Sequence, residues 1–150
     1  MINQLDLLIV GAGPTGIEAA LQAKQRQLNY LLIDTQDAGS LIEQTMANKK
    51  FYQVYGRNTD RLRGSLAFPD RIKGLDLVNL WKDQVKGLNF HKDETLVSTT
   101  KSKEGFSITT SKAPYQTTYL LLTSGTFEHP LTLGLPGEAA NPKVHYALDY

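Results

Sequence analysis

Three glycines near the start of the chain, Gly11, Gly13 and Gly16, have the G-x-G-x-x-G spacing of a dinucleotide-binding turn. The first glycine allows a tight turn, the second lets the backbone approach a pyrophosphate, and the third lets a helix pack closely on a strand. Asp34 follows 18 residues after Gly16, where a carboxylate can accept hydrogen bonds from a ribose hydroxyl pair. The alternative is a glycine-rich turn in another α/β unit, which leaves Asp34 without a role. The pattern therefore predicts a dinucleotide site.

The elements around these residues fit that chemistry. Apolar residues at 7–10 predict a strand before the turn, a helical pattern follows it, and a second apolar run at 31–33 ends on Asp34. The helix N-terminus would offer unpaired N–H groups and the positive end of its dipole to phosphates. Strand, glycine turn, helix and strand thus form one unit over residues 5–34.

The composition bounds the possible functions. A length of 150 residues suits one domain with a buried core, and 16 basic against 15 acidic residues imply neither a nucleic-acid-binding surface nor a trap for acidic ligands. The absence of cysteine excludes disulfides, thiolate nucleophiles and cysteine metal sites from this chain. No apolar run approaches the about 18 residues of a membrane span, and no basic segment or cleavage site precedes the strand expected from residue 5, so we expect neither a membrane span nor a signal peptide. We therefore expect a cytoplasmic protein.

Residues 46–68 form an irregular stretch that is rich in cations and aromatic side chains. The simplest interpretation is a solvated connection whose aromatic residues pack on the sheet or near a cofactor. Two other interpretations stay open: some of the cations contact a phosphate-bearing ligand or an acidic partner, or the stretch holds a single-stranded nucleic acid. The residues concerned are Lys49, Lys50, Phe51, Tyr52, Tyr55, Arg57, Arg61 and Arg63.

The second half of the chain changes its hydrophobic period. Residues 74–88 have the helical spacing of an amphipathic helix that ends near Gly87, and residues 88–90 predict a short parallel strand. From residue 95 to 123 the period is two, so three runs separated by turns predict an antiparallel meander. Its last strand is expected to return into the main sheet at residues 120–122. The remaining residues are rich in proline and glycine and predict mostly loop.

The order of the segments resembles the FAD domain of the pyridine nucleotide-disulfide oxidoreductases, and most closely the thioredoxin reductase-like branch. The segments read GAGPTGIEAA, IDTQDAGS, FPDRIKGLDLVNLWKDQV, then the meander, then LLLTSGTFEHPLTLGLPGE. This resemblance covers nearly the whole chain. It implies an α/β fold of the Rossmann-like three-layer FAD/NAD(P)-binding type, with a parallel sheet and an antiparallel β-meander over one face. The ligand is then expected at the carboxyl ends of the parallel strands.

The resemblance also implies which residues bind FAD. The glycine turn would hold the pyrophosphate, Asp34 the adenosine ribose, residues 39–45 the flavin side, the backbone of Glu94 the adenine, and residues 123–125 would pass close to the flavin. Since the family more often has Glu where this chain has Asp34, the shorter side chain would need a water or a shifted ribose. The expected contacts are Gly11, Gly13, Pro14, Thr15, Gly16, Asp34, Gly39, Ser40, Leu41, Thr45, Glu94, Thr123, Ser124 and Gly125.

Two departures from the family limit the functional prediction. Thioredoxin reductases carry Cys-x-x-Cys in a segment similar to KVHYALDY, and alignment on Val144 puts Ala147 and Tyr150 at the cysteine positions. Thioredoxin reduction is therefore not expected, and the tail resembles instead thioredoxin reductase-like ferredoxin–NADP reductases and bacillithiol disulfide reductase-like proteins. Family enzymes also have an NAD(P)H domain and a C-terminal Gly-Asp segment that this sequence does not contain. We expect an FAD-binding portion that is catalytically incomplete without a second domain or chain.

No catalytic acid, base or nucleophile stands out in the sequence. His91, His129 and His145 have no ligand spacing, so no metal site is predicted, and no serine lies in a G-x-S-x-G elbow. Two alternative functions stay open. One is a non-catalytic nucleotide-binding or regulatory module that retains the fold. The other is an NAD-binding dehydrogenase domain, which is disfavoured because the meander has no role in a simple nicotinamide-binding fold.

Overall fold

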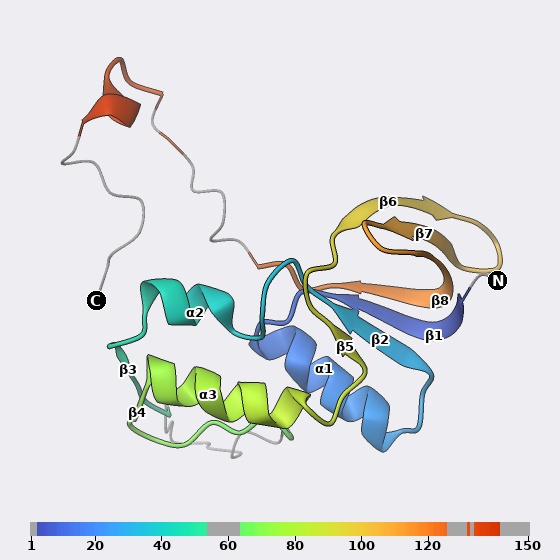
Figure 1. The fold of residues 1–150 in the computed structure, drawn as a ribbon, viewed down its shortest axis with the longest axis horizontal. Helices are drawn as coiled ribbons and strands as arrows, with labels where there is room; N and C mark the ends of the chain where they lie inside the picture. The colour runs from blue at the N-terminus through green and yellow to red at the C-terminus, as the bar shows by residue number, and fades with distance from the viewer. Residues whose placement is uncertain (1–2, 54–63, 126–131, 133, 142–150) are drawn as a thin grey trace, which may run out of the picture.

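The computed structural model describes residues 3–53, 64–125, 132 and 134–141. Its centre is a six-stranded sheet with the strand order β5-β2-β1-β8-β7-β6 (Figure 1). In that order the strands are β5 (Phe90–His91), β2 (Tyr30–Ile33), β1 (Asn3–Val10), β8 (Pro114–Leu122), β7 (Phe106–Thr110) and β6 (Leu96–Lys101).

The sheet has a parallel half and an antiparallel half, which meet at β8. β1 pairs in parallel with both β2 and β8, and β2 pairs in parallel with β5. β7 pairs antiparallel with β6 and with β8. Leu120 lies opposite Leu8 and Leu122 opposite Val10, so the predicted return of the meander into the main sheet is confirmed. The predicted Rossmann-like α/β fold is confirmed with it.

Two helices, α1 (Pro14–Gln25) and α3 (Gly74–Val85), cover one face of the parallel half (Figure 1). Leu77, Trp81 and Val85 recur at helical spacing on α3 and are buried, with Trp81 only 1% exposed. They belong to one apolar cluster with Ile9 of β1 and Ile17 of α1. Burial of this cluster holds α1 against the strand that ends in the glycine turn.

The meander curls over the opposite face of the sheet (Figure 1). Leu8 and Leu31 of the parallel strands lie in a second buried cluster with Ile108 of β7 and Tyr115 of β8. The helices, the parallel strands and the curled meander thus form three layers, as the sequence predicts.

Two segments differ from the sequence prediction. The stretch after Asp34 was expected to be a loop but contains α2 (Ser40–Thr45), and the irregular connection contains a ribbon of β3 (Lys50–Phe51) and β4 (Ile72–Lys73). These elements span six and two residues, too few to show a hydrophobic period. The rings of Phe51 and Phe68 contact each other edge to face, with 6.4 Å between their centroids. Both pack against the apolar cluster that contains Trp81 and Ile17, which fits a packing role for these aromatic residues.

Other predictions shift slightly or fall outside the described residues. The strand predicted at 88–90 is β5, and α3 ends at Val85 with Lys86 as its cap, one residue before Gly87. A short 3-10 helix, η1 (Glu138–Ala140), lies in the proline-rich tail. Within the described ranges, no helix is both long and apolar enough to cross a membrane. Outside those ranges lie Tyr55, Arg57, Arg61, Arg63, His129, Val144, His145, Ala147 and Tyr150.

Candidate functional site

The glycine turn follows β1 at the carboxyl end of the parallel strands. The Gly11 amide donates to the Ile33 carbonyl oxygen at 2.8 Å, which ties the turn to the end of β2. Gly11 has a φ of 107°, and a Cβ at this residue would lie 2.5 Å from the Thr123 carbonyl oxygen. Only glycine fits here, because the φ is unfavourable for other residues and a neighbouring backbone occupies the side-chain position.

The other two glycines of the motif have opposite surroundings. A Cβ at Gly16 would overlap the Gly11 carbonyl oxygen and lie 2.7 Å from the Thr123 hydroxyl oxygen. Gly13 is the N-cap of α1, and a Cβ there would have no atom within 4 Å. Gly16 therefore permits packing inside the protein, whereas Gly13 leaves open space in front of the first turn of a 12-residue helix. The first amides of such a helix lack partners within the helix and favour an anion.

Thr123 fixes the turn from the side of β8. Its amide and its hydroxyl both donate to the Val10 carbonyl oxygen, at 2.8 and 2.9 Å. The hydroxyl also lies 2.8 Å from the Gly11 carbonyl oxygen. Thr123 thus joins the start of the 123–125 segment to the glycine turn, although the two are more than 100 residues apart in the sequence.

Asp34 stands across the turn at the end of β2. One carboxylate oxygen accepts the Ala12 amide at 2.5 Å, and the other accepts the Gln36 amide at 2.8 Å. Charge-assisted hydrogen bonds of this kind are stronger than neutral ones, so the carboxylate has a defined place beside the glycine turn. The Thr35 hydroxyl also lies 3.4 Å from Oδ1, whereas Oδ2 keeps a second acceptor position for a ligand hydroxyl.

A second loop completes this end of the sheet. The Gly39 amide donates to the Ala12 carbonyl oxygen at 3.0 Å, so the loop before α2 lies against the glycine turn. Gly39 has a φ of 72°, and a Cβ there would lie 3.1 Å from Val78 and 3.3 Å from Trp81. The close packing on α3 sets where α2 begins, and with it the positions of Ser40 and Leu41.

These segments enclose one cavity of about 370 Å³. All of the residues expected to contact FAD line it except Gly16, Thr45 and Glu94. The sequence analysis did not predict three lining residues, Ala12, Ile42 and Met46. Ile42 and Met46 lie four residues apart, in α2 and at its C-cap, so they could be predicted only once α2 itself was recognised. The lining residues are Gly11, Ala12, Gly13, Pro14, Thr15, Asp34, Gly39, Ser40, Leu41, Ile42, Met46, Thr123, Ser124 and Gly125.

The three exceptions do not line the cavity. Gly16 packs beneath the glycine turn. The Thr45 hydroxyl donates to the Leu41 carbonyl oxygen at 2.7 Å within α2. Glu94 is 1% exposed, and its backbone amide donates to the Asp34 carbonyl oxygen at 2.9 Å.

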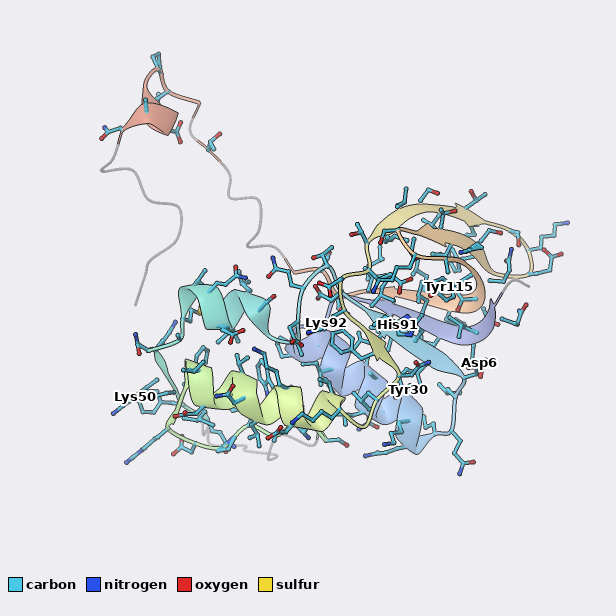
Figure 2. The ribbon with its side chains drawn as sticks, in the orientation of Figure 1. Asp6, Tyr30, Lys50, His91, Lys92 and Tyr115 are labelled. Atoms are coloured by element: carbon cyan, nitrogen blue, oxygen red, sulfur yellow. The ribbon has the colours of Figure 1, made fainter. Side chains whose placement is uncertain are left out.

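The Glu94 carboxylate is the centre of a buried polar cluster. It accepts hydrogen bonds from the Thr110 hydroxyl at 2.6 Å and the Tyr115 hydroxyl at 2.9 Å, and His91 Nδ1 lies 2.9 Å away. Figure 2 labels two of these partners, His91 and Tyr115. Burial raises the pKa of Glu94, but the bonds from Thr110, His91 and Tyr115 outweigh it, so the pKa lies below the usual 4.5. Burial and the contact with Glu94 raise the pKa of Tyr115 to about 12.

The chemistry of the cavity is that of binding. Asp34 supplies the charge among its lining side chains, while the glycine turn, α1 and the 123–125 segment present mainly backbone. Among the described residues no group of three His, Cys, Asp or Glu side chains could hold a metal ion. The arrangement places the N-terminus of α1, whose amides favour an anion, beside a carboxylate that can accept hydrogen bonds from hydroxyl groups.

Comparison with known proteins gives the family. The sequence profile described as "Pyridine nucleotide-disulphide oxidoreductase" matches residues 5–150. The chain belongs to this family. Bacilliredoxin reductase Bdr of Bacillus subtilis (strain 168) is 30% identical over 149 residues, which span 93% of this chain and 44% of the relative. A ferredoxin–NADP reductase of Streptococcus pneumoniae (strain Hungary19A-6) is 31% identical over 150 residues, spanning 97% and 43%.

Solved structures of this oxidoreductase family share the fold. Bacillithiol disulfide reductase Bdr from Staphylococcus aureus matches with a TM-score of 0.75 at 20% identity over 91% of this chain and 43% of that one. Thioredoxin reductase of T. acidophilum matches with a TM-score of 0.65 at 26% identity, over 91% and 40%. The predicted resemblance to the thioredoxin reductase-like branch is thus confirmed. The chain spans less than half the length of the curated relatives it matches.

Proposed function

We propose that this chain is the FAD-binding portion of an NAD(P)H-dependent flavoprotein oxidoreductase. The observation that carries the proposal is the open space in front of Gly13. There the N-terminus of α1 faces the same cavity as Asp34, and a Cβ would have no atom within 4 Å. A pyrophosphate fits that opening because the helix end attracts anions and glycine lets the backbone approach closely. Family membership makes FAD the expected dinucleotide.

The residues of the cavity divide into parts with different roles. Gly11 to Gly16, with Pro14 and Thr15, would hold the pyrophosphate, and Asp34 would accept the adenosine ribose hydroxyls. Ser40 and Leu41 from α2, with the 123–125 segment, would line the flavin side. For Thr45 and Glu94, which do not line the cavity, we propose support of the lining residues rather than contact through their own side chains.

The bound flavin would supply the redox chemistry by accepting a hydride from the reduced nicotinamide. The chain's own residues bind and orient the cofactor, which agrees with a cavity whose lining contains one acid and no base. The 150 residues contain no cysteine, so no dithiol of this chain relays electrons. We propose that the NAD(P)H site belongs to the portion of the relatives that these residues do not span, and that the protein acts in the cytoplasm.

An exposed apolar surface on β8 supports the proposal that another part of the protein, or a second chain, packs against these residues. Tyr119 and Leu121, two residues apart and therefore on one face, are 67% and 37% exposed, although both lie on a central strand that pairs with β1. Tyr119 lies opposite Leu7 on the side of the sheet that carries α1 and α3. Exposed apolar groups of this size on a central strand are typical of a surface that another segment or chain covers.

The proposal is tested by titrating the purified chain with FAD, NAD and NADP in parallel, using calorimetry and flavin fluorescence. We expect FAD to bind at least about tenfold more tightly than either nicotinamide dinucleotide, because only FAD would use both the glycine turn and the flavin side. Asp34→Asn should weaken the binding of FAD. Asp83 is an exposed acid on α3, so Asp83→Asn should leave FAD binding unchanged. Tighter binding of NAD would favour the dehydrogenase alternative, and no binding of FAD would contradict the proposal.

A non-catalytic module is the second candidate, because these 150 residues contain no cysteine for a redox dithiol and the cavity lining contains no base. The two candidates differ in turnover. NAD(P)H oxidation by the chain together with a separately produced remainder of the protein would exclude the regulatory module. FAD binding without any such turnover would favour it.

A further inference from the structure

Glu94 is a buried acid that lies beside the cavity without lining it. We propose that Glu94 is a positioning residue that holds the Asp34 carboxylate in place, so that the meander contributes to recognition of the adenosine ribose without touching it. This inference rests on the proposed function, and it assigns the buried carboxylate a role in selecting ligands that carry a ribose hydroxyl pair.

The first step of the argument is the backbone of Asp34. Its amide donates to the His91 carbonyl oxygen at 3.1 Å, and its carbonyl oxygen accepts the Glu94 amide at 2.9 Å. The loop from residue 91 to 94 therefore grips the ribose-binding residue on both sides. Any shift of this loop moves the backbone from which the Asp34 side chain extends.

The second step is the anchoring of that loop. The Glu94 carboxylate contacts one side chain on each of three strands: His91 on β5, Thr110 on β7 and Tyr115 on β8, at 2.6 to 2.9 Å. The loop also contains Asp93 at a φ of 58°, a left-handed conformation that persists in a non-glycine residue only where the surroundings enforce it. The three contacts to Glu94 supply that constraint.

The third step is the effect on the cavity. Asp34 Oδ2 lies 2.5 Å from the Ala12 amide nitrogen, so this hydrogen bond places the side chain of the acid against the glycine turn, next to the backbone bond from Gly11 to Ile33. A displaced Asp34 would lose this bond as well as its alignment with a ribose. Glu94 thus controls, through Asp34, the geometry of both nucleotide-binding parts.

A purely structural role for Glu94 predicts different behaviour. A carboxylate that only stabilises the meander would, when removed, loosen the whole protein and weaken every ligand alike. If Glu94 positions Asp34, its removal should weaken the binding of ligands that carry both ribose hydroxyls more than the binding of ligands that lack them. The ratio of affinities for ADP and 2′-deoxy-ADP therefore separates the two roles.

The test compares Glu94→Met, Glu94→Gln and the control Glu104→Met in the 150-residue chain. Glu104 is an exposed acid in the β6–β7 turn, bonded to Ser102. Calorimetry with ADP, 2′-deoxy-ADP and FMN should show an approximately tenfold loss of ADP affinity in Glu94→Met, with the ADP to 2′-deoxy-ADP ratio falling toward one. The affinity for FMN, which has no adenosine ribose, should change by less than about twofold in Glu94→Met. Since a glutamine side chain retains an acceptor for Thr110 and Tyr115, the ADP affinity of Glu94→Gln should stay within about threefold of the wild-type affinity.

A ligand-free measurement makes the result independent of the proposed function. The Ala12 amide should lose about tenfold of its hydrogen-exchange protection in Glu94→Met, but not in Glu94→Gln or Glu104→Met. An unchanged Ala12 amide, or an equal loss for ADP, 2′-deoxy-ADP and FMN, would overturn the positioning role. Absence of ADP and FAD binding to the wild-type chain would instead contradict the proposed function. If Glu94→Met does not fold, Tyr115→Phe removes one of the three contacts and should show the same pattern at smaller size.

Discussion

Gly13 and Gly16 belong to the same motif, yet substitution by alanine should affect them in opposite ways. We expect Gly13→Ala to leave the free energy of unfolding nearly unchanged and to weaken nucleotide binding. We expect Gly16→Ala to destabilise the protein itself. The reason is where each new methyl group would lie: at Gly13 in open space, and at Gly16 on the Gly11 carbonyl oxygen.

The magnitudes follow from the local geometry. Gly13 has a φ of −77° and a ψ of −176°, which alanine adopts without strain. Loss of the N-cap preference for glycine and the lower entropy of the unfolded alanine chain are each about 0.5–1 kcal/mol and oppose each other, so the net change should stay within about 1 kcal/mol. A methyl group between the turn and a pyrophosphate should remove at least one hydrogen bond to a charged group, about 1.5–3 kcal/mol or about 10- to 100-fold in affinity.

At Gly16 the methyl group can be accommodated only by moving α1 away from the turn. Overpacking of this kind costs about 1–3 kcal/mol, and more where the obstructing atom belongs to the backbone. The loss should appear in the ligand-free protein.

The assay is urea unfolding followed through the fluorescence of Trp81, the single tryptophan, combined with calorimetric titration of ADP and FAD. Gly13→Ala should retain the wild-type unfolding midpoint and bind more weakly, and Gly16→Ala should shift the midpoint to lower urea. Wild-type affinity in Gly13→Ala would refute the placement of the pyrophosphate over this turn. Wild-type stability in Gly16→Ala would refute the described packing of α1 on β1.

Three further predictions concern residues around the site. Thr123→Val removes the hydroxyl bonds to the Val10 and Gly11 carbonyl oxygens and should lower the free energy of unfolding by about 1 kcal/mol, with Thr123→Ser close to wild type in the same urea experiment. Trp81→Phe loses the 2.7 Å bond from the indole N–H to the Ala67 carbonyl oxygen and leaves a void in the core, so thermal unfolding followed by circular dichroism should show a loss of about 2–3 kcal/mol. Burial raises the pKa of Glu18, but bonds from the amides of Ser65 and Leu66 and from the Gln22 side chain outweigh it, so the pKa lies below 4.5. The ionised Glu18 therefore stabilises the fold above about pH 4.5, and this contribution disappears as pH falls through the lowered pKa. The stability difference between wild type and Glu18→Leu should accordingly shrink between about pH 6 and pH 3, and a constant difference would contradict the assignment.

The sequence predicted the parts of the fold that rest on local patterns. The glycine spacing, the apolar run of β1 and the period of α3 each depend on neighbours within one or two turns of chain. Asp34 could be proposed as a ligand residue for the same reason, because it ends a recognisable strand. The prediction that Leu120 to Leu122 enter the main sheet was also confirmed, because these residues pair in parallel with β1.

The remaining features depend on contacts between distant residues. The bond from Ala12 to Asp34 and the cluster around Glu94 join residues 16 to 22 positions apart, and no pattern within one segment announces them. α2 was missed because six residues carry too little periodicity, and its missed lining residues, Ile42 and Met46, followed from that error. Glu94 was expected to contact the adenine through its backbone, and this expectation stays a prediction.

The close packing of Gly11, Gly16 and Thr123 has a consequence for adaptation of the site. At Gly11 and Gly16 the backbone packs directly against other backbone atoms. A substitution at either glycine therefore cannot add a side chain that recognises a ligand without disrupting the turn. New ligand preferences must arise at the rim, where Asp34, Ser40 and Met46 present replaceable side chains. Efforts to retarget this scaffold to a different nucleotide should therefore randomise the rim and leave these glycines untouched.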